Sequence, residues 1–228
     1  MEGITCVLFD LDNTLIEIPN TWIYFDTLIQ DVMEQIFNLP IPPKEQRDTL
    51  WRSGKEYIKI LQSWGVKDPD EFWYHFDQFD AKKRRVLIQQ QKLFLYEDTL
   101  PTLNRLNKIP ELKIGIVTNT PTFLAIEELE AYNLTHFFNE IIGLGEDQSI
   151  CKPEPTGINQ ILRRMDKNHK NTLFIGDSLV DIQAGINAHV TPILIDRHRR
   201  KSKGLKGIHP SKYLYCNSLQ EIFNLVQF

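Results

Sequence analysis

Residues 4–14 read ITCVLFDLDNT, in which a short run of Ile, Val, Leu and Phe leads directly into Asp10 and Asp12. The apolar run has the length and composition of a buried β-strand. Two later apolar runs also end in polar residues: VTNT (117–120) follows residues 112–116, and GDSLVD (176–181) follows residues 172–175. Because the carboxyl ends of parallel strands meet in one crevice of an open sheet, we expect these polar groups to converge there.

A fourth block, CKPEP (151–155), contributes one ammonium group, Lys152. Each block alone has an ordinary interpretation: an Asp-x-Asp pair often lies in a turn or caps a helix, and Thr-Asn-Thr-Pro often begins one. Together, in this order and at strand ends, they favour a catalytic site. Carboxylates, a hydroxyl and an ammonium suit a hard cation and a phosphate.

Composition excludes several classes of protein. The net charge of −4 gives no overall basic field for nucleic acid, and the basic stretch 197–206, without interleaved aromatic residues, is interpreted as a solvated loop. No apolar stretch has the length of a membrane span, and the first residues do not resemble a signal peptide. Three widely spaced cysteines argue against a disulfide framework or a zinc site. We therefore expect a cytoplasmic protein with no nucleic-acid or membrane partner.

Strand and helix patterns alternate along most of the chain, which predicts a parallel α/β sheet. An all-helical block interrupts the alternation, with helices expected over 21–39, 44–64, 68–80 and 81–94. The expected fold is a Rossmann-like α/β core of residues 1–16 and 94–228 with an inserted all-helical domain, residues 17–93. Thr120 is expected to cap the helix that runs through Leu129.

The four blocks resemble the four motifs of the haloacid-dehalogenase-like (HAD) hydrolase superfamily, and the resemblance covers the whole chain. The position of the helical block resembles the C1 type of cap domain, and only 33 residues separate Thr118 from Lys152. This places the chain near the phosphoglycolate-phosphatase-like subfamily. Two residues depart from the family pattern: Asn13 and His189 stand where many relatives have glycine, and His189 is expected to lower local stability.

The resemblance implies a role for each candidate residue. Asp10 would be the nucleophile that forms an aspartyl-phosphate, and Asp12 the general acid and base. Thr118, Asn119 and Lys152 would bind the phosphoryl group. Mg²⁺ would be held by the side chains of Asp10 and Asp177 and the backbone carbonyl of Asp12. Asp181 would orient a metal-bound water or pair with Lys152.

The implied activity is Mg²⁺-dependent hydrolysis of a small-molecule phosphomonoester. A phosphotransferase or phosphomutase of the same superfamily, or a non-catalytic phospho-ligand sensor, remains an alternative. The substrate class is a small phosphorylated metabolite, with phosphoglycolate, a sugar phosphate and a nucleoside monophosphate all open, and the chain is expected to be a monomer or homodimer. Specificity candidates in the helical block are Trp22, Tyr24, Trp51, Arg52 and Lys55.

Overall fold

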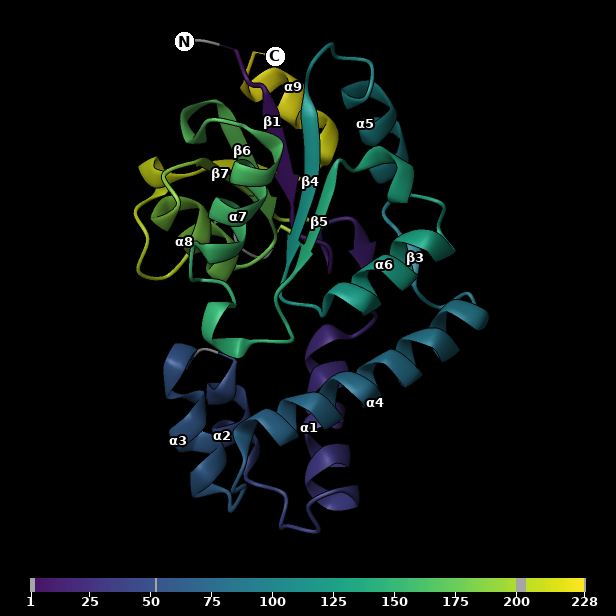
Figure 1. The fold of residues 1–228 in the computed structure, drawn as a ribbon, viewed down its shortest axis with the longest axis vertical. Coiled ribbons are helices and arrows are strands. Elements are labelled where there is room, and N and C mark those ends of the chain that lie inside the picture. The colour runs from purple at the N-terminus through teal and green to yellow at the C-terminus, as the bar shows by residue number, and fades with distance from the viewer. Residues whose placement is uncertain (1–2, 52, 200–203, 228) are drawn as a thin grey trace. The chain divides into compact units, whose positions relative to one another are not determined.

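The computed structural model describes residues 3–51, 53–199 and 204–227. Within these ranges, Lys55 is described by its backbone alone. The chain forms two compact units (Figure 1): an α/β core of residues 1–17 and 95–228, and a helical unit of residues 18–94. The expected fold class, a Rossmann-like core with an inserted all-helical domain, is confirmed. Among the described residues, none of the helices has both the length and the apolar character that a membrane span needs.

The core is built on one six-stranded sheet in which every paired strand is parallel. Its spatial order is β5-β4-β1-β6-β7-β8. The strands are β1 (Cys6–Phe9), β4 (Lys113–Thr118), β5 (Glu140–Gly143), β6 (Thr172–Gly176), β7 (Thr191–Ile195) and β8 (Leu214–Cys216). The chain adds β4 and β5 on one side of β1, and then β6, β7 and β8 on the other side. Such a change of direction opens a crevice at the carboxyl ends of the flanking strands.

Helices cover both sides of this sheet. They are α5 (Thr99–Leu106), α6 (Thr122–Ala131), α7 (Thr156–Met165), α8 (Leu179–Asn187) and α9 (Ile222–Leu225). Figure 1 shows α7 and α8 on one side of the strands and α5 on the other. Ile158 and Ile161 of α7 and Ala184 of α8 pack on Leu8 and Phe174 of the central strands in one buried cluster. Burial of these apolar side chains fixes the helices that follow the strands.

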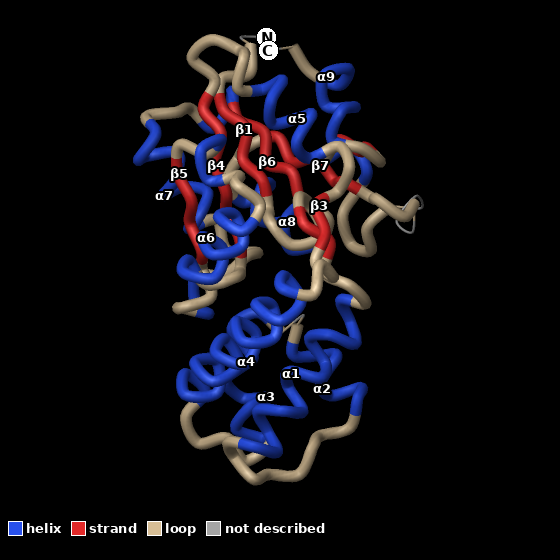
Figure 2. The backbone as a smooth tube through the Cα atoms, turned by 90° about the vertical axis from the view of Figure 1, so that its right-hand side faces the viewer, coloured by secondary structure: helices blue, strands red, loops and turns tan. Residues whose placement is uncertain are grey.

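The helical unit leaves and rejoins the core through a two-stranded ribbon of β2 (Ile16–Glu17) and β3 (Phe94–Leu95). Its helices (Figure 2) are α1 (Thr21–Gln35), α2 (Lys44–Leu50), α3 (Tyr57–Ser63) and α4 (Pro69–Gln89). The single helix expected over 44–64 is wrong, because the chain turns at Gly54, whose φ is 49°. The expected break after residue 80 is also wrong: Arg84 donates to Asp80 one turn earlier (3.0 Å) within a continuous α4.

Two of the five specificity candidates contact other side chains of the helical unit: Tyr24 is buried and Trp51 is half-buried. The Tyr24 hydroxyl donates to the Asp80 carboxylate (2.5 Å). The Trp51 ring packs against Phe25 and Trp73. Trp22, by contrast, is 60% exposed. Arg52 and the side chain of Lys55 lie outside the described residues. Trp22 is therefore the most exposed of the described candidates.

The turn after α8 contains a strained histidine. His189 has a φ of 57°, in the left-handed region that disfavours residues with a Cβ atom. Two backbone hydrogen bonds enforce it, from Val190 N to Gly185 O (3.1 Å) and from His189 N to Ile186 O (3.0 Å), the pattern of a Schellman turn. We expect His189→Gly to raise the free energy of unfolding by about 0.5–1 kcal/mol, because glycine adopts this φ without steric cost.

Urea denaturation at equilibrium would measure this gain, with His189→Ala as the control. Alanine keeps the Cβ atom and hence the strain, so its free energy of unfolding should not rise. A glycine variant no more stable than the natural protein would contradict the prediction.

Candidate active site

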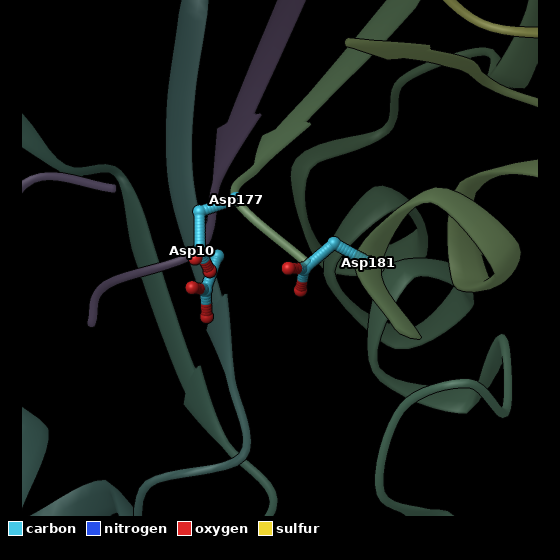
Figure 3. A group of neighbouring side chains, drawn as sticks. All are labelled: Asp10, Asp177 and Asp181. Atoms are coloured by element: carbon cyan, nitrogen blue, oxygen red, sulfur yellow. The ribbon is translucent and has the colours of Figure 1, made fainter. Parts of the chain in front are cut away.

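Three acidic residues gather at the carboxyl ends of β1 and β6. Asp10 follows β1 and Asp177 follows β6, and Asp10 N donates to Ile175 O (2.8 Å), which joins the two strand ends. Asp181 extends from the first turn of α8 toward the other two residues (Figure 3). One carboxylate oxygen from each residue lies within 4.8 Å of the others. The convergence expected from the sequence is therefore present in the structure, and the cluster could hold a metal ion.

Gly176 allows Asp181 to come this close. A Cβ atom at position 176 would lie 2.4 Å from the Asp181 Cβ atom, a distance that real side chains do not tolerate. Asp181 is then fixed by a capping box: its Oδ2 accepts from the backbone N and the hydroxyl of Ser178, while its N–H donates to the Ser178 hydroxyl. The start of α8 thus sets the position of the Asp181 carboxylate.

Lys152 joins two members of the acidic cluster. Its Nζ donates to Asp10 Oδ1 and to Asp181 Oδ1, at 2.6 Å in both cases. The Lys152 side chain is only 3% exposed. Since both Asp181 oxygens are engaged, one by Lys152 and one by Ser178, Asp181 is placed to orient Lys152. One buried ammonium therefore contacts two carboxylates of a cluster of three.

This imbalance of charge changes the acidity of the cluster. Burial raises the pKa of Asp10 to about 8; the Lys152 ammonium opposes the change, and the Asp181 and Asp177 carboxylates add to it. Burial alone would lower the pKa of Lys152, but Asp10 and Asp181 raise it above its ordinary value. Lys152 therefore stays charged, and the cluster lacks positive charge. A divalent cation would supply it, so the donor set fits Mg²⁺ or a similar ion.

The raised pKa of Asp10 predicts how stability depends on pH without metal. An aspartate in an unfolded chain has a pKa of about 3.9, so the folded state binds the proton more tightly. Its contribution to stability is complete below pH ~4 and is lost as pH rises toward ~8. Thermal unfolding in EDTA should show the natural protein losing more stability from pH 5 to pH 8.5 than Asp10→Asn does. Parallel curves for the two proteins would contradict this.

Asn119 holds the segment that carries Lys152. Its amide oxygen accepts from the backbone N of Lys152 (2.8 Å), and its amide nitrogen donates to the Lys152 carbonyl (3.3 Å). The side chain expected to assist phosphate binding is thus engaged in fixing the lysine. Thr118, at the end of β4, is buried, and its Oγ1 accepts from Thr120 N (3.2 Å), which leaves its hydroxyl proton available for a ligand.

Thr120 does not have the helix-capping role expected for it. The N-cap of α6 is Pro121, and the helix begins at Thr122. The Thr120 hydroxyl instead donates to Asp12 Oδ2 (3.2 Å). Asp12 is half-buried in the turn after β1, where Asn13 adopts a φ of 58°. Thr120 therefore orients the second aspartate of the first motif, a contact that the sequence pattern did not reveal.

Two further residues near Asp10 were not among the candidates. The Thr14 hydroxyl donates to Asp10 Oδ2 (3.3 Å). Arg197, the first residue of the basic stretch interpreted as a solvated loop, donates to the Thr14 carbonyl and to Asp98 Oδ1. Its side chain is 8% exposed, so the solvated interpretation is wrong at this position. Within that stretch, residues 200–203 lie outside the described part of the chain.

Comparison with known proteins finds a family model and relatives that match most of the chain. The family model described as haloacid dehalogenase-like hydrolase matches residues 4–189. A phosphoglycolate phosphatase of Aliivibrio fischeri is 31% identical over 194 residues, which cover 80% of each chain. The pyrophosphatase PpaX of Listeria monocytogenes is 28% identical over 187 residues, covering 81% of this chain and 80% of that one.

A solved structure described as a predicted phosphoglycolate phosphatase from Haemophilus somnus has the same fold. It superposes with a TM-score of 0.67 at 24% identity and covers 99% of both chains. The family model spans most of the chain, including every candidate residue of the site. The chain is therefore an enzyme of the haloacid dehalogenase-like hydrolase family.

Proposed function

We propose that this enzyme is a Mg²⁺-dependent phosphatase that hydrolyses a small phosphomonoester through an aspartyl-phosphate on Asp10. The observation that carries the proposal is the buried Lys152 ammonium, placed between Asp10 and Asp181 beside a third carboxylate. This arrangement offers a nucleophile and a fixed positive charge within one crevice, as phosphoryl transfer requires. The phosphatase names of the curated relatives support the same reaction class.

In the proposed first step, Asp10 attacks phosphorus. Its Oδ1 is held by Lys152 and its Oδ2 by Thr14, so the carboxylate has a fixed orientation. Lys152 and the Thr118 hydroxyl stabilise the charge on the transferring phosphoryl oxygens. Asp12, oriented by Thr120, donates a proton to the leaving alcohol.

In the proposed second step, Asp12 takes a proton from the water that hydrolyses the aspartyl-phosphate. Asp10, Asp177 and the backbone carbonyl of Asp12 would hold the cation, while Asp181 stays engaged with Lys152 and Ser178. When bound, Mg²⁺ offsets the negative charge of the carboxylates and the phosphate.

The proposal is tested by measuring phosphate release from a panel of compounds in Mg²⁺ and in EDTA. The panel contains 2-phosphoglycolate, a sugar phosphate, a nucleoside monophosphate and inorganic pyrophosphate. Asp166→Asn serves as a matched control, because Asp166 is an exposed aspartate at the end of α7 and asparagine tolerates its left-handed backbone. Mg²⁺-dependent release by the natural protein and the control is expected. No release from any compound would instead favour a phosphotransferase or a phospho-ligand sensor.

Asp177 and Asp181 are expected to differ in their effect on the metal requirement. Asp177→Ala removes a proposed direct ligand and should raise the Mg²⁺ concentration for half-maximal activity by at least about tenfold. Asp181→Asn loosens Lys152, so it should lower kcat with a smaller change in that concentration. A Mg²⁺ titration of phosphate release for both variants measures the contrast. Equal shifts in metal requirement would contradict the assignment of Asp177 as the direct ligand.

A further inference from the structure

Arg197 lies just beyond the end of β7 and contacts three residues in two segments that are distant from it in sequence. One guanidinium nitrogen donates to Asp98 Oδ1 (2.5 Å), and another donates to the Thr14 carbonyl. The guanidinium also stacks on the Tyr96 ring, with 4.0 Å between the Arg197 Cζ atom and the ring centroid. The turn after β1 is thereby fastened to residues 96–98, where the chain returns from the helical unit.

Asp98 is itself held in place, so it anchors Arg197 firmly. Its Oδ2 accepts from the Ser218 hydroxyl (2.6 Å) and from Leu219 N (2.7 Å). Although burial alone would raise the pKa of Asp98, the hydrogen bonds from Arg197 and Ser218 hold it below its usual value. Asp98 therefore remains charged, and the pair with Arg197 persists at neutral pH.

Thr14 connects Arg197 to Asp10 through two hydrogen bonds. Arg197 holds the Thr14 carbonyl, and the hydroxyl of the same residue donates to Asp10 Oδ2 (3.3 Å). The next residue, Leu15, is held by the same return segment: its carbonyl accepts from Thr99 Oγ1 (2.9 Å) and from Tyr96 N (3.2 Å). The orientation of the Asp10 carboxylate thus depends on a backbone segment that Arg197 and its neighbours fix.

The third nitrogen of the Arg197 guanidinium, Nε, differs from the two that bind Asp98 and Thr14. Its Nε is buried and has no hydrogen-bond partner among the described residues. Buried donors without a partner are rare in folded proteins and call for a specific explanation. Here the fork that reaches both Asp98 and Thr14 leaves the third nitrogen unsatisfied. Lysine could not replace this fork, because it carries a single donor group on a flexible chain.

We propose that Arg197 is a positioning residue for the reaction, which fixes the Thr14 carbonyl so that the Thr14 hydroxyl keeps Asp10 aimed at the substrate. This inference rests on the proposed phosphatase function. The competing explanation is that the Arg197–Asp98 pair only stabilises the fold. The two explanations differ in whether the effect of Arg197 on turnover passes through the Thr14 hydroxyl.

A double-mutant cycle separates them. Phosphate release is measured for the natural protein, Arg197→Met, Thr14→Val and the double variant, with the phosphomonoester that the panel shows to be turned over fastest. Each single variant should lower kcat by about 10- to 100-fold, because small displacements of a reacting group have effects of this size. KM should change by less than about threefold, since neither residue binds substrate in this proposal.

The decisive result is the double variant. If Arg197 acts through Thr14, the kcat of the double variant should lie within about threefold of the kcat of the less active single variant. The proposal would be overturned if the loss of kcat in the double variant equalled the product of the two single-variant losses. It would also be overturned if Arg197→Met kept the kcat of the natural protein. Arg197→Lys should recover only part of the kcat lost in Arg197→Met, and Thr14→Ser should retain more activity than Thr14→Val because it keeps the hydroxyl.

Two controls keep the result interpretable. Arg164→Met removes another arginine of the α/β core. Arg164 forms an exposed ion pair with Glu140 (3.4 Å), so this substitution should leave kcat unchanged. Thermal unfolding of every variant sets the assay temperature below each transition, so that loss of folded protein is not counted as loss of turnover. If the natural protein releases no phosphate, the proposed function fails; if it does and the cycle is multiplicative, only the role of Arg197 fails.

Discussion

Replacing Asp10 with asparagine should lower phosphate release by about 10⁴-fold or more, the scale seen when an enzyme loses its nucleophile. An amide is a far weaker nucleophile than a carboxylate and cannot form the proposed aspartyl-phosphate. The fold should persist, because asparagine has the same shape and Lys152 retains Asp181 as a partner. Initial rates with Mg²⁺, together with the thermal unfolding temperature of each protein, measure both expectations.

A second measurement locates the intermediate. Acid-quenched enzyme, sampled during turnover and digested, should carry a phosphoryl group on the peptide that contains Asp10. The Asp10→Asn protein treated in the same way should carry none. Turnover near the natural rate in Asp10→Asn, or a phosphoryl group on a different peptide, would refute Asp10 as the nucleophile. The exposed-aspartate variant Asp166→Asn should behave as the natural protein in both measurements.

The central strands and the acidic residues at their ends could be predicted from the sequence for a local reason. The run 6–9 is apolar throughout because β1 is buried on both faces, and a polar residue marks the point where the strand leaves the sheet. The parallel arrangement then brings Asp10, Thr118 and Asp177 to one edge without any knowledge of side-chain contacts. Local composition and one topological rule were sufficient for this part.

The contacts that orient these residues could not be predicted in the same way. Thr120 and Asp12 are 108 positions apart, and Arg197 and Thr14 are 183 positions apart. The threonine before proline, Thr120, also fits the sequence pattern of a helix cap. The arginine in the basic stretch, Arg197, also fits the pattern of a side chain exposed to solvent. Only the packed structure shows which acceptor lies within reach, so both local interpretations were wrong.

The helical unit shows the same limit at the level of elements. Helical periodicity correctly indicated an all-helical insertion, but not where each helix ends. Gly54 interrupts one expected helix, whereas the buried Asp80–Arg84 pair lies within α4 where two helices were expected. Tyr24 shows why specificity residues were also hard to select: its ring is buried and its hydroxyl is engaged by Asp80. Residue type alone does not distinguish a core aromatic from one that contacts a ligand.

Replacing Lys152 with methionine should have the second-largest effect on turnover, a loss of about 10³-fold in kcat, because the fixed charge that stabilises the phosphoryl group is removed. Methionine keeps much of the side-chain volume, so the loss would reflect charge. The variant should also be destabilised in EDTA, by about 3 kcal/mol at pH 8, since Asp10 and Asp181 lose their shared cationic partner beside the Asp177 carboxylate.

The double variant Asp10→Asn/Lys152→Met distinguishes charge compensation from packing. If the instability of Lys152→Met arises from uncompensated carboxylates, removing the charge of Asp10 should restore part of the lost free energy of unfolding while leaving the enzyme inactive. Mg²⁺ should stabilise Lys152→Met more than it stabilises the double variant, because the single variant keeps more negative charge for the cation to offset. Urea denaturation with and without Mg²⁺ measures these differences. A double variant less stable than both single variants would show instead that Lys152 supports the site through packing.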